Sequence, residues 1–217
     1  MDAVILAGGK GSRMDDALPK ALVNAKGKPI ISYHLDYLSR FDTVRHFILA
    51  LGHKADMIAD YVKENHHGLD VALSVEAKPL GTAGALKKAL SYSLSQTVLA
   101  LNCDDITDIN VPRLGLRTEN TICVAHPPLP FGRVAIENGY VKQFEEKPLY
   151  PSWVSCGWYL FNRDDILDAL PNSGSLEYDV FPRIRLAAFP HTGFWKPLNS
   201  KKDIEEFDRM PLPGALR

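Results

Sequence analysis

The stretch that decides the fold reads Leu6-Ala7-Gly8-Gly9-Lys10-Gly11-Ser12-Arg13-Met14, followed by Pro19-Lys20. A short apolar strand over 3–7 runs directly into three glycines within four residues. The backbone can therefore turn sharply there and present bare N–H groups to an anion. Arg13 and Lys20 bring two positive charges to the same loop. The stretch predicts a loop that holds a polyphosphate at the end of a first strand.

This loop differs from the two best-known phosphate-binding patterns. The dinucleotide fingerprint needs another glycine three residues after Gly11, where Met14 stands, and the Walker pattern needs Gly-Lys-Ser/Thr in a fixed frame. An ordinary dinucleotide-binding Rossmann protein is therefore disfavoured. It stays open as an alternative that a cofactor-binding titration would test.

Strand-like and helix-like segments alternate through the first half of the chain. After the first strand we expect strands over 45–51, 70–75 and 97–101, and helices over 29–41, 54–65 and 82–94. This alternation predicts an α/β fold with a Rossmann-like, mostly parallel sheet and helices on both faces. Ligands bind outside the carboxyl ends of the strands in such sheets, so the glycine loop and 102–105 would share one edge.

The second half of the chain has a different pattern. After a strand over 121–125, the segments 132–137 and 140–145 flank Asn138-Gly139, the strongest short hairpin signal. This predicts a β-rich insertion. We then expect a strand over 153–161, helices over 163–170, 177–188 and 203–209, and a loose tail over 210–217.

Charge and composition set limits on partners and compartment. The formal net charge is −1, which gives no overall attraction to nucleic acid or to an anionic membrane. An anion site must come from a local cluster, and Lys10, Arg13 and Lys20 form one. The chain has no apolar run of membrane-spanning length, no secretory leader pattern and three cysteines, an odd number that suggests reduced thiols. We therefore expect a cytoplasmic protein without nucleic-acid or membrane partners.

The opening stretch closely resembles the signature of the sugar-1-phosphate nucleotidyltransferases, the nucleotide-sugar pyrophosphorylases. Their signature reads Leu-Ala-Gly-Gly, any residue, Gly-Ser/Thr-Arg-Leu/Met and then Pro-Lys. Later segments repeat the resemblance in order, over 1–207. It implies the nucleotide-diphospho-sugar transferase fold in one catalytic domain over 1–217. The nucleotide-binding half would be 1–118 and the sugar-phosphate-binding half 119–209, the latter containing the β-rich insertion.

The resemblance also implies which residues bind the nucleotide. The segment Glu76-Ala77-Lys78-Pro79-Leu80-Gly81-Thr82-Ala83-Gly84 would select the base, since glycines at a helix start let a flat base lie against the backbone. Taken alone, this segment is also compatible with a glycine-softened helix N-terminus. The implied nucleotide contacts are Leu6, Ala7, Gly8, Gly9, Gly11, Ser12, Glu76, Gly81 and Thr82.

The implied catalytic residues are Arg13, Lys20 and Asp104. Arg13 would hold the leaving pyrophosphate, Lys20 the α-phosphate region, and Asp104 a Mg²⁺ ion. Without the resemblance, Asp104 or Asp105 could simply cap a turn or helix. The family commonly has a second metal-binding aspartate after its last tryptophan, but Asn199 stands at that place, and an uncharged amide oxygen coordinates a hard cation less strongly.

The sugar-phosphate contacts are implied by segments of the second half. Phe144-Glu145-Glu146-Lys147-Pro148 resembles the Glu-Lys-Pro motif of the family, in which Lys147 would contact the phosphate and Glu146 a sugar hydroxyl. Gly157 matches a family glycine in a segment where Ser155 replaces the usual asparagine. The implied sugar-phosphate residues are Gly132, Glu146, Lys147, Gly157 and Glu177.

The expected reaction joins a nucleoside triphosphate to a sugar 1-phosphate and releases pyrophosphate. The run 79–84 is most similar to guanylyltransferases of mannose 1-phosphate or manno-heptose 1-phosphate, so GTP is the preferred nucleotide. Cytidylyl or thymidylyl transfer on the same fold remains an alternative, as does a catalytically weak regulatory protein that binds nucleotide sugars. A homo-oligomer is compatible with the sequence.

Overall fold

A seven-stranded sheet forms the centre of the computed structural model, which describes residues 1–9 and 17–217. Its strand order is β12-β8-β11-β6-β1-β4-β5, and β11 runs antiparallel to both neighbours while the other described pairs are parallel. The expected mostly parallel sheet is confirmed. The strands are β1 (Asp2–Leu6), β4 (His46–Leu51), β5 (Val71–Val75), β6 (Thr97–Asn102), β8 (Thr121–Ala125), β11 (Val154–Asn162) and β12 (Ala187–Pro190).

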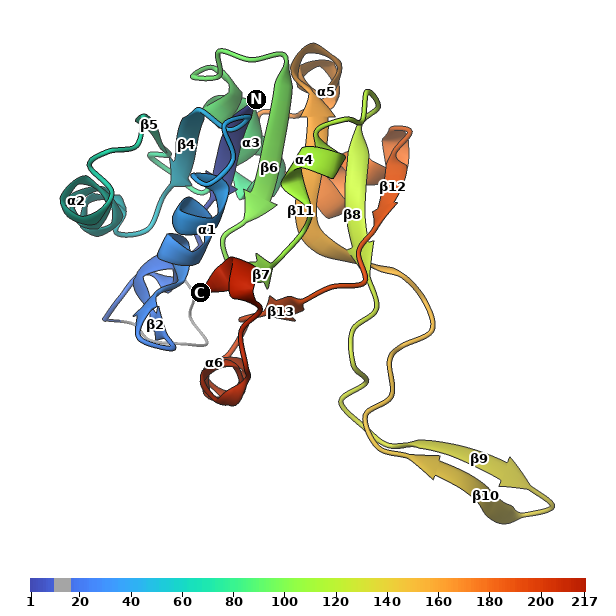
Figure 1. Cartoon of the computed structure of the whole chain (residues 1–217). Coiled ribbons are helices and arrows are strands. Elements are labelled where there is room, and N and C mark those ends of the chain that lie inside the picture. The colour runs from blue at the N-terminus through green and yellow to red at the C-terminus, as the bar shows by residue number, and fades with distance from the viewer. Residues whose placement is uncertain (10–16) are drawn as a thin grey trace.

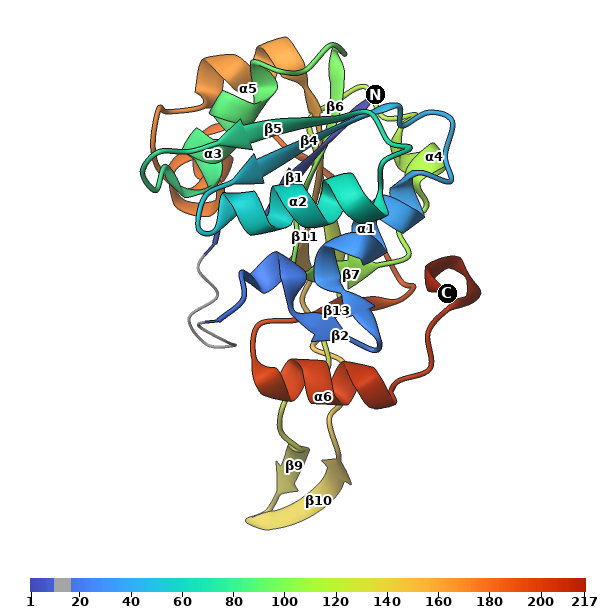
Figure 2. The same cartoon turned by 90° about the vertical axis from the view of Figure 1, so that its left-hand side faces the viewer.

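Helices cover both faces of this sheet (Figures 1 and 2). α1 (Ile30–Leu38) and α2 (Ala55–Asn65) pack on one face, and α3 (Gly81–Leu90) and α5 (Arg163–Ala169) on the other. The shorter elements are η1 (Lys20–Leu22), β2 (Asn24–Ala25), β3 (Lys28–Pro29), β7 (Asp105–Thr107), α4 (Val111–Leu114), β13 (Trp195–Pro197), α6 (Lys201–Arg209) and η4 (Gly214–Leu216). In the part of the chain that the structure describes, no helix is long and apolar enough to cross a membrane.

The first strand is buried on both faces. Ala3 and Ile5 belong to the core beneath α1 and α2, whereas Val4 belongs to the core beneath α3, and all three are 0% exposed. This explains why β1 reads as a continuous apolar run rather than an alternating one. Its carboxyl end delivers Leu6 and Ala7 to the edge of the sheet.

Asp2 ties the beginning of β1 to the loop after α3. Its buried carboxylate accepts hydrogen bonds from the Ser93 and Ser95 hydroxyls and from the Leu94 and Ser95 amides, at 2.6–3.0 Å. Burial alone would raise the pKa of Asp2, but these bonds outweigh it and hold the pKa below its usual 3.8. The ionised form is therefore the one that stabilises the fold.

Asp2→Asn is expected to cost about 1–3 kcal/mol of unfolding free energy at pH 7, because the amide cannot accept all of these bonds. Since the folded pKa is lowered, the contribution of Asp2 is present above pH 3.8 and is lost as the pH falls through the folded pKa. Urea unfolding of both proteins at pH 7 and in acid measures this. If the difference in unfolding free energy between the two proteins did not shrink in acid, the expected pH dependence of the Asp2 contribution would be wrong.

Two expectations for the second half are wrong. The helix expected over 177–188 is instead a π-type turn η2 (Leu176–Val180), a 3-10 turn η3 (Phe181–Arg183) and then β12. Pro182 has no N–H to continue a helix, and Phe189 is buried where β12 pairs with β8. The tail is not loose, because Leu216 is buried and Arg40 donates 2.6 Å hydrogen bonds to the carbonyls of Ala215 and Arg217.

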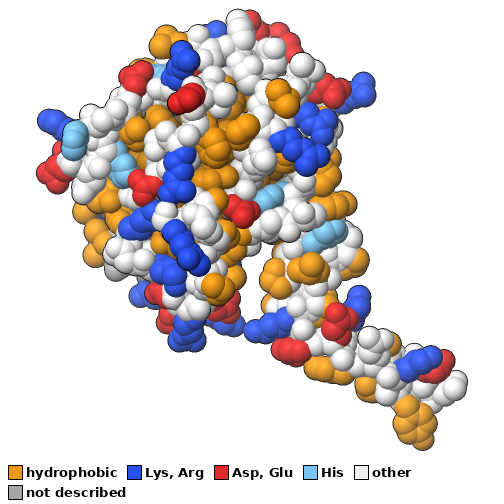
Figure 3. Space-filling model, viewed as in Figure 1, with side chains coloured by type: hydrophobic (Ala, Val, Ile, Leu, Met, Phe, Trp, Pro, Cys, Tyr) orange, Lys and Arg blue, Asp and Glu red, His pale blue; other side chains and the backbone are white. Residues whose placement is uncertain are grey.

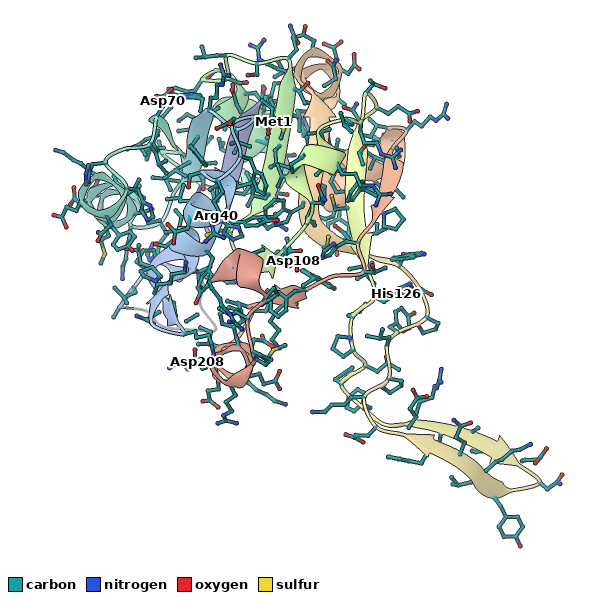
Figure 4. The ribbon with its side chains drawn as sticks, viewed as in Figure 1. Met1, Arg40, Asp70, Asp108, His126 and Asp208 are labelled. Carbon is teal, nitrogen blue, oxygen red and sulfur yellow. The ribbon has the colours of Figure 1, made fainter. Side chains whose placement is uncertain are left out.

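The predicted hairpin forms and projects from the body (Figures 1 and 2). β9 (Arg133–Glu137) and β10 (Tyr140–Glu145) pair around Asn138-Gly139, both of which have the positive φ expected of such a turn. We call residues 126–153 the arm. His126 lies where the arm leaves the body (Figure 4), between β8 and β11.

Candidate active site

A cavity of about 790 Å³ opens at the carboxyl ends of β1, β4, β5 and β6. This is the edge of a parallel sheet at which ligands are expected to bind. The segments that line it follow those four strands, together with the start of α3, η1 and the loop before α6. The lining residues are Leu6, Ala7, Gly8, Gly9, Lys20, Ala21, Ala50, Gly52, His53, Glu76, Ala77, Lys78, Pro79, Gly81, Thr82, Ala85, Asn102, Cys103, Asp104 and Asn199.

The start of the glycine loop lies in this cavity. The Gly8 carbonyl accepts a 3.2 Å hydrogen bond from the His53 N–H, and a Cβ at Gly8 would lie 3.2 Å from the Gly52 nitrogen. The close approach of these two loops is a local reason for glycine at position 8. Lys10, Gly11, Ser12 and Arg13 lie outside the described residues, so their predicted roles remain predictions.

Lys20 lies between two oxygen-bearing side chains at the cavity wall. Its ammonium forms an ion pair with the Asp104 carboxylate and lies 3.4 Å from Asn199 Oδ1. The Lys20 and Asp104 side chains are only 19% and 25% exposed, so water screens their attraction less than it would on an open surface. The structure thus brings together three residues that are up to 179 positions apart.

Backbone pairing explains how Asn199 reaches Asp104. β13 pairs with β7, and the Leu198 N–H donates a 2.8 Å hydrogen bond to the Asp104 carbonyl. The Asn199 N–H in turn donates to Asp203 Oδ2 at 3.0 Å. Neither β7 nor β13 was predicted from the sequence, because each has only three residues.

A buried histidine supports the same loop from beneath. His34 of α1 donates from Nε2 to the Cys103 carbonyl at 2.7 Å, and burial lowers the pKa of His34 to about 4. The ring is therefore neutral at pH 7, which makes Nε2 the donor to this carbonyl. His34 thus helps to position Asp104 without adding charge.

Asp105 points away from the cavity. Its carboxylate is nearly buried and accepts hydrogen bonds from Trp195 Nε1 at 2.9 Å and Asn102 Nδ2 at 3.3 Å. Burial, together with the negative charge of Asp104, raises the pKa of Asp105 to about 7. Of the two adjacent aspartates, only Asp104 lines the cavity.

Hydrogen bonds and close backbone packing within the protein fix the segment that is expected to select the base. Glu76 Oε2 accepts a 3.0 Å hydrogen bond from the Leu80 N–H. Gly81 has φ +72°, and a Cβ there would lie 2.2 Å from the Gly174 carbonyl oxygen, which accepts a 3.0 Å bond from the Ala83 N–H. Glycine at position 81 is therefore required by close backbone packing, although Gly81 still lines the cavity.

The predicted sugar-side residues fall into three places. Glu177 is not a lining residue, but its carboxylate accepts a 3.1 Å hydrogen bond from the hydroxyl of Thr82, which lines the cavity. Gly157 lies under Asp105, because a Cβ on Gly157 would be 2.0 Å from Asp105 Oδ2. Gly132, Glu146 and Lys147 lie on the arm and are absent from the described cavity lining.

His53, which follows β4, lines the cavity but belonged to no predicted site segment. Lys78 and Asn102 also line it; they lay within predicted site segments but were not named as site residues. Their position at or just after the carboxyl ends of parallel strands is the signal that could have identified them.

Comparison with known proteins identifies the family. A model described as "Nucleotidyl transferase" matches residues 2–184. Mannose-1-phosphate guanylyltransferase catalytic subunit beta of Drosophila melanogaster is 34% identical, over 93% of this chain and 60% of its own length. D-glycero-alpha-D-manno-heptose 1-phosphate guanylyltransferase of Campylobacter jejuni is 32% identical, over 82% of this chain and 83% of its own. A probable glucose-1-phosphate cytidylyltransferase of Bacillus subtilis is 28% identical over 97% and 96%.

A solved structure agrees with these matches. The crystal structure of HddC from Yersinia pseudotuberculosis complexed with GMP-PN is similar with a TM-score of 0.76 and 26% identity, over 95% of this chain and 97% of that one. The fold and the site thus define an α/β enzyme that transfers nucleotidyl groups. The chain belongs to the nucleotidyl transferase family, as a sugar-1-phosphate nucleotidyltransferase, which confirms the expected class.

Proposed function

We propose that this enzyme transfers a guanylyl group from GTP to mannose 1-phosphate or a manno-heptose 1-phosphate and releases pyrophosphate. Two relatives that are more than 30% identical are named as guanylyltransferases of these sugar phosphates, and the similar HddC structure contains GMP-PN. The geometric support is the Lys20–Asp104–Asn199 cluster, which lines the same cavity as Gly8 and Gly9.

The chain's own residues account for most of the chemistry. A sugar 1-phosphate oxygen attacks the α-phosphorus in line and pyrophosphate leaves, so the main task is to hold two polyanions in position. Lys20 supplies positive charge beside the glycine loop, and Arg13 is proposed to bind the departing pyrophosphate. No general base is needed, because a phosphate monoester is already ionised at neutral pH.

The residues around Asp104 fit a divalent cation such as Mg²⁺. Asp104 offers a carboxylate and Asn199 an amide oxygen, and the two already share one cation, the Lys20 ammonium. Mg²⁺ in nucleotide sites is commonly held by one or two carboxylates together with phosphates and water. When bound, the ion would neutralise charge on the phosphates.

Asn199→Asp is expected to lower the Mg²⁺ concentration needed for half-maximal activity by about 3–10-fold, because it adds a charged oxygen ligand. Asn199→Ala should change it in the opposite direction. Mg²⁺ titrations followed by rate and by calorimetry in the presence of nucleotide measure both. An unchanged Mg²⁺ requirement in both variants would exclude Asn199 from the metal site.

The decisive experiment measures pyrophosphate release for each of the four nucleoside triphosphates against a panel of sugar 1-phosphates. The proposal expects the highest kcat/KM with GTP and a manno-configured sugar. The Bacillus subtilis relative, which matches nearly the full length of this chain, makes cytidylyl transfer the second candidate, and a preference for CTP would establish it. Binding of nucleotide sugars without turnover would instead favour a regulatory protein.

A further inference from the structure

Asn199 reaches the cavity from a short segment that is neither strand nor helix. The segment 198–200 follows β13 and precedes α6. The side-chain oxygen of Asn199 is nonetheless 3.4 Å from the Lys20 ammonium, which is paired with Asp104. An amide oxygen carries no net charge, so Coulombic attraction does not draw it to a cation as it would draw a carboxylate. Its contribution to the site therefore depends on how firmly the chain holds it in place.

α6 is the helix that anchors this segment. Ile204 and Phe207 are buried and fix the inner face of α6 to the core, whereas charged side chains of both signs gather on its outer surface (Figures 1 and 3). Ser200 is the N-cap of the helix, and its hydroxyl accepts a 3.3 Å hydrogen bond from the Asp203 N–H. Asp203 is the third residue of the helix, so Ser200 and Asp203 have the spacing of a capping box.

The Asp203 carboxylate differs from that of the usual capping box in its backbone partner. In the usual box the acidic side chain accepts a hydrogen bond from the N–H of the N-cap residue itself. Here Oδ2 of Asp203 accepts from the N–H of Asn199, one residue earlier, at 3.0 Å, and from the Ser200 hydroxyl at 2.8 Å. The carboxylate therefore fixes the backbone of the residue whose side chain contacts Lys20.

Asp203 is itself held in place by a lysine of β13. Lys196 Nζ lies 3.7 Å from Asp203 Oδ1 and 2.7 Å from Glu206 Oε2. The Lys196 and Asp203 side chains are 15% and 27% exposed, so water screens their attraction less than it would on an open surface. Lys196 precedes Asn199 in the chain and Asp203 follows it. The ion pair thus joins the two ends of the segment that carries Asn199.

Two consecutive amides of this segment are anchored to different parts of the protein. The Leu198 N–H donates to the Asp104 carbonyl at 2.8 Å, and the Asn199 N–H donates to the Asp203 carboxylate. The Leu198 side chain is buried. The first bond fixes the segment to the cavity wall and the second fixes it to α6. Together they leave the backbone of Asn199 little freedom to turn its side chain away from Lys20.

We propose that Asp203 is a positioning residue of the candidate metal site. It holds Asn199 so that Oδ1 faces the cation beside Asp104, and Lys196 in turn holds Asp203. The effect on the metal rests on the proposed function, whereas the effect on the segment 198–199 does not. A carboxylate that served only to cap α6 is expected to bond the N-cap N–H, so the bond to the Asn199 N–H is the observation that carries the proposal.

Amide hydrogen exchange, resolved by residue with NMR, tests the positioning without any assay of activity. Asp203→Ala is expected to raise the exchange rate of the Leu198 amide by about 10-fold or more, although that amide bonds Asp104 and not Asp203. Glu206→Gln is the matched control, because it removes the other carboxylate that pairs with Lys196, and it should leave the Leu198 rate unchanged. An unchanged Leu198 rate in Asp203→Ala, or an equal rise in the control, would overturn the proposal.

The requirement for Mg²⁺ tests the effect on the site. Asp203→Ala is expected to raise the Mg²⁺ concentration for half-maximal activity by about 3–10-fold, because it weakens the same ligand that Asn199→Ala removes. The kcat at saturating Mg²⁺ should stay within about twofold of the wild type, since the ligand is displaced and not lost. Asp203→Asn should stay close to the wild type, because its amide oxygen can still accept from the Asn199 N–H. Calorimetry of Mg²⁺ binding in the presence of nucleotide makes the same comparison without turnover.

A double-mutant cycle shows whether Asp203 acts through Asn199. In an Asn199→Ala background, Asp203→Ala is expected to add no further change to the Mg²⁺ requirement, because the oxygen that it positions is already gone. Effects that multiply would show that Asp203 acts by another route and would refute the proposal. An unchanged Mg²⁺ requirement in Asp203→Ala would also refute it, and so would equal defects in Asp203→Asn and Asp203→Ala, which indicate charge and not position.

Thermal unfolding separates positioning from a loss of stability. Asp203→Ala removes part of a helix cap, so its melting temperature should fall by about 2–4 °C. Asn162→Ala is the control for stability, since Asn162 caps α5 through the Asp164 and Asp165 amides and does not line the cavity. It should lose similar stability and keep the wild-type Mg²⁺ requirement, and an equal rise in that requirement would contradict the positioning role.

The failure of this proposal is distinguishable from the failure of the proposed function. A wild type that is inactive with all four triphosphates would refute the reaction. The exchange rate of the Leu198 amide would still decide whether Asp203 holds the segment.

Discussion

Asp104→Asn is expected to lower kcat by about 10²–10³-fold, the loss typical of removing one preorganised charge-stabilising group. The substitution removes the only carboxylate that pairs with Lys20 among the described residues, and with it the charged oxygen proposed to hold the metal. Stability should change by no more than about 1 kcal/mol, because the pair is partly exposed and an amide can still accept a bond. Steady-state kinetics and thermal unfolding of the same preparations measure both.

Asp36→Asn is the matched control. Lys28 and Asp36 form a second Lys–Asp pair at 2.7 Å, with side-chain exposures of 30% and 40%, and neither residue lines the cavity. The control should keep wild-type kcat. If Asp104→Asn instead retained its turnover and lost stability, Asp104 would be a structural residue, and the proposed site would be wrong.

Gly157→Ala is expected to destabilise the fold by about 3–5 kcal/mol. This cost is the sum of backbone strain, because alanine disfavours the left-handed conformation, and of overpacking by the added Cβ in the core. Gly157 has φ +74°, and an added Cβ would lie 2.0 Å from Asp105 Oδ2. The displaced carboxylate would lose its bonds to Trp195 and Asn102. For a chain of this size the melting temperature should fall by roughly 10 °C.

Gly27→Ala separates the two contributions. Gly27 also has a positive φ, of +91°, but an added Cβ there meets nothing within 4 Å. Its cost should be only about 1–2 kcal/mol, from backbone strain alone. Equal losses in the two variants would show that contact with Asp105 does not matter for stability, and would leave the sugar contact implied by resemblance as the reason for glycine at position 157.

Short-range patterns predicted the elements whose type is specified by neighbouring residues. The strands near 3–7, 45–51 and 97–101 consist mainly of consecutive apolar residues, and the Asn138-Gly139 turn specifies its hairpin by backbone conformation. The prediction of a helix over 177–188 was wrong because the apolar residues there belong to different elements and do not share one helix face. Leu176 and Val180 fill the core beneath α3, whereas Phe189 belongs to an edge strand beyond Pro182.

The amino-acid sequence by itself determined the family, the parallel sheet and the strand ends at which Gly8, Gly9, Glu76 and Asp104 gather. The resemblance of short motifs indicated the family, whereas the sheet and its strand ends follow from hydrophobic period and glycine placement, which act over a few residues. Only the tertiary structure decided that Asp104 faces the cavity while Asp105 is buried, that Asn199 reaches Lys20, and that Glu146 and Lys147 stand on a projecting arm. Those outcomes depend on pairing between segments that are far apart in the sequence, such as β7 and β13. The free energy of such pairing depends on tertiary context, so a pattern of neighbouring residues does not reveal it.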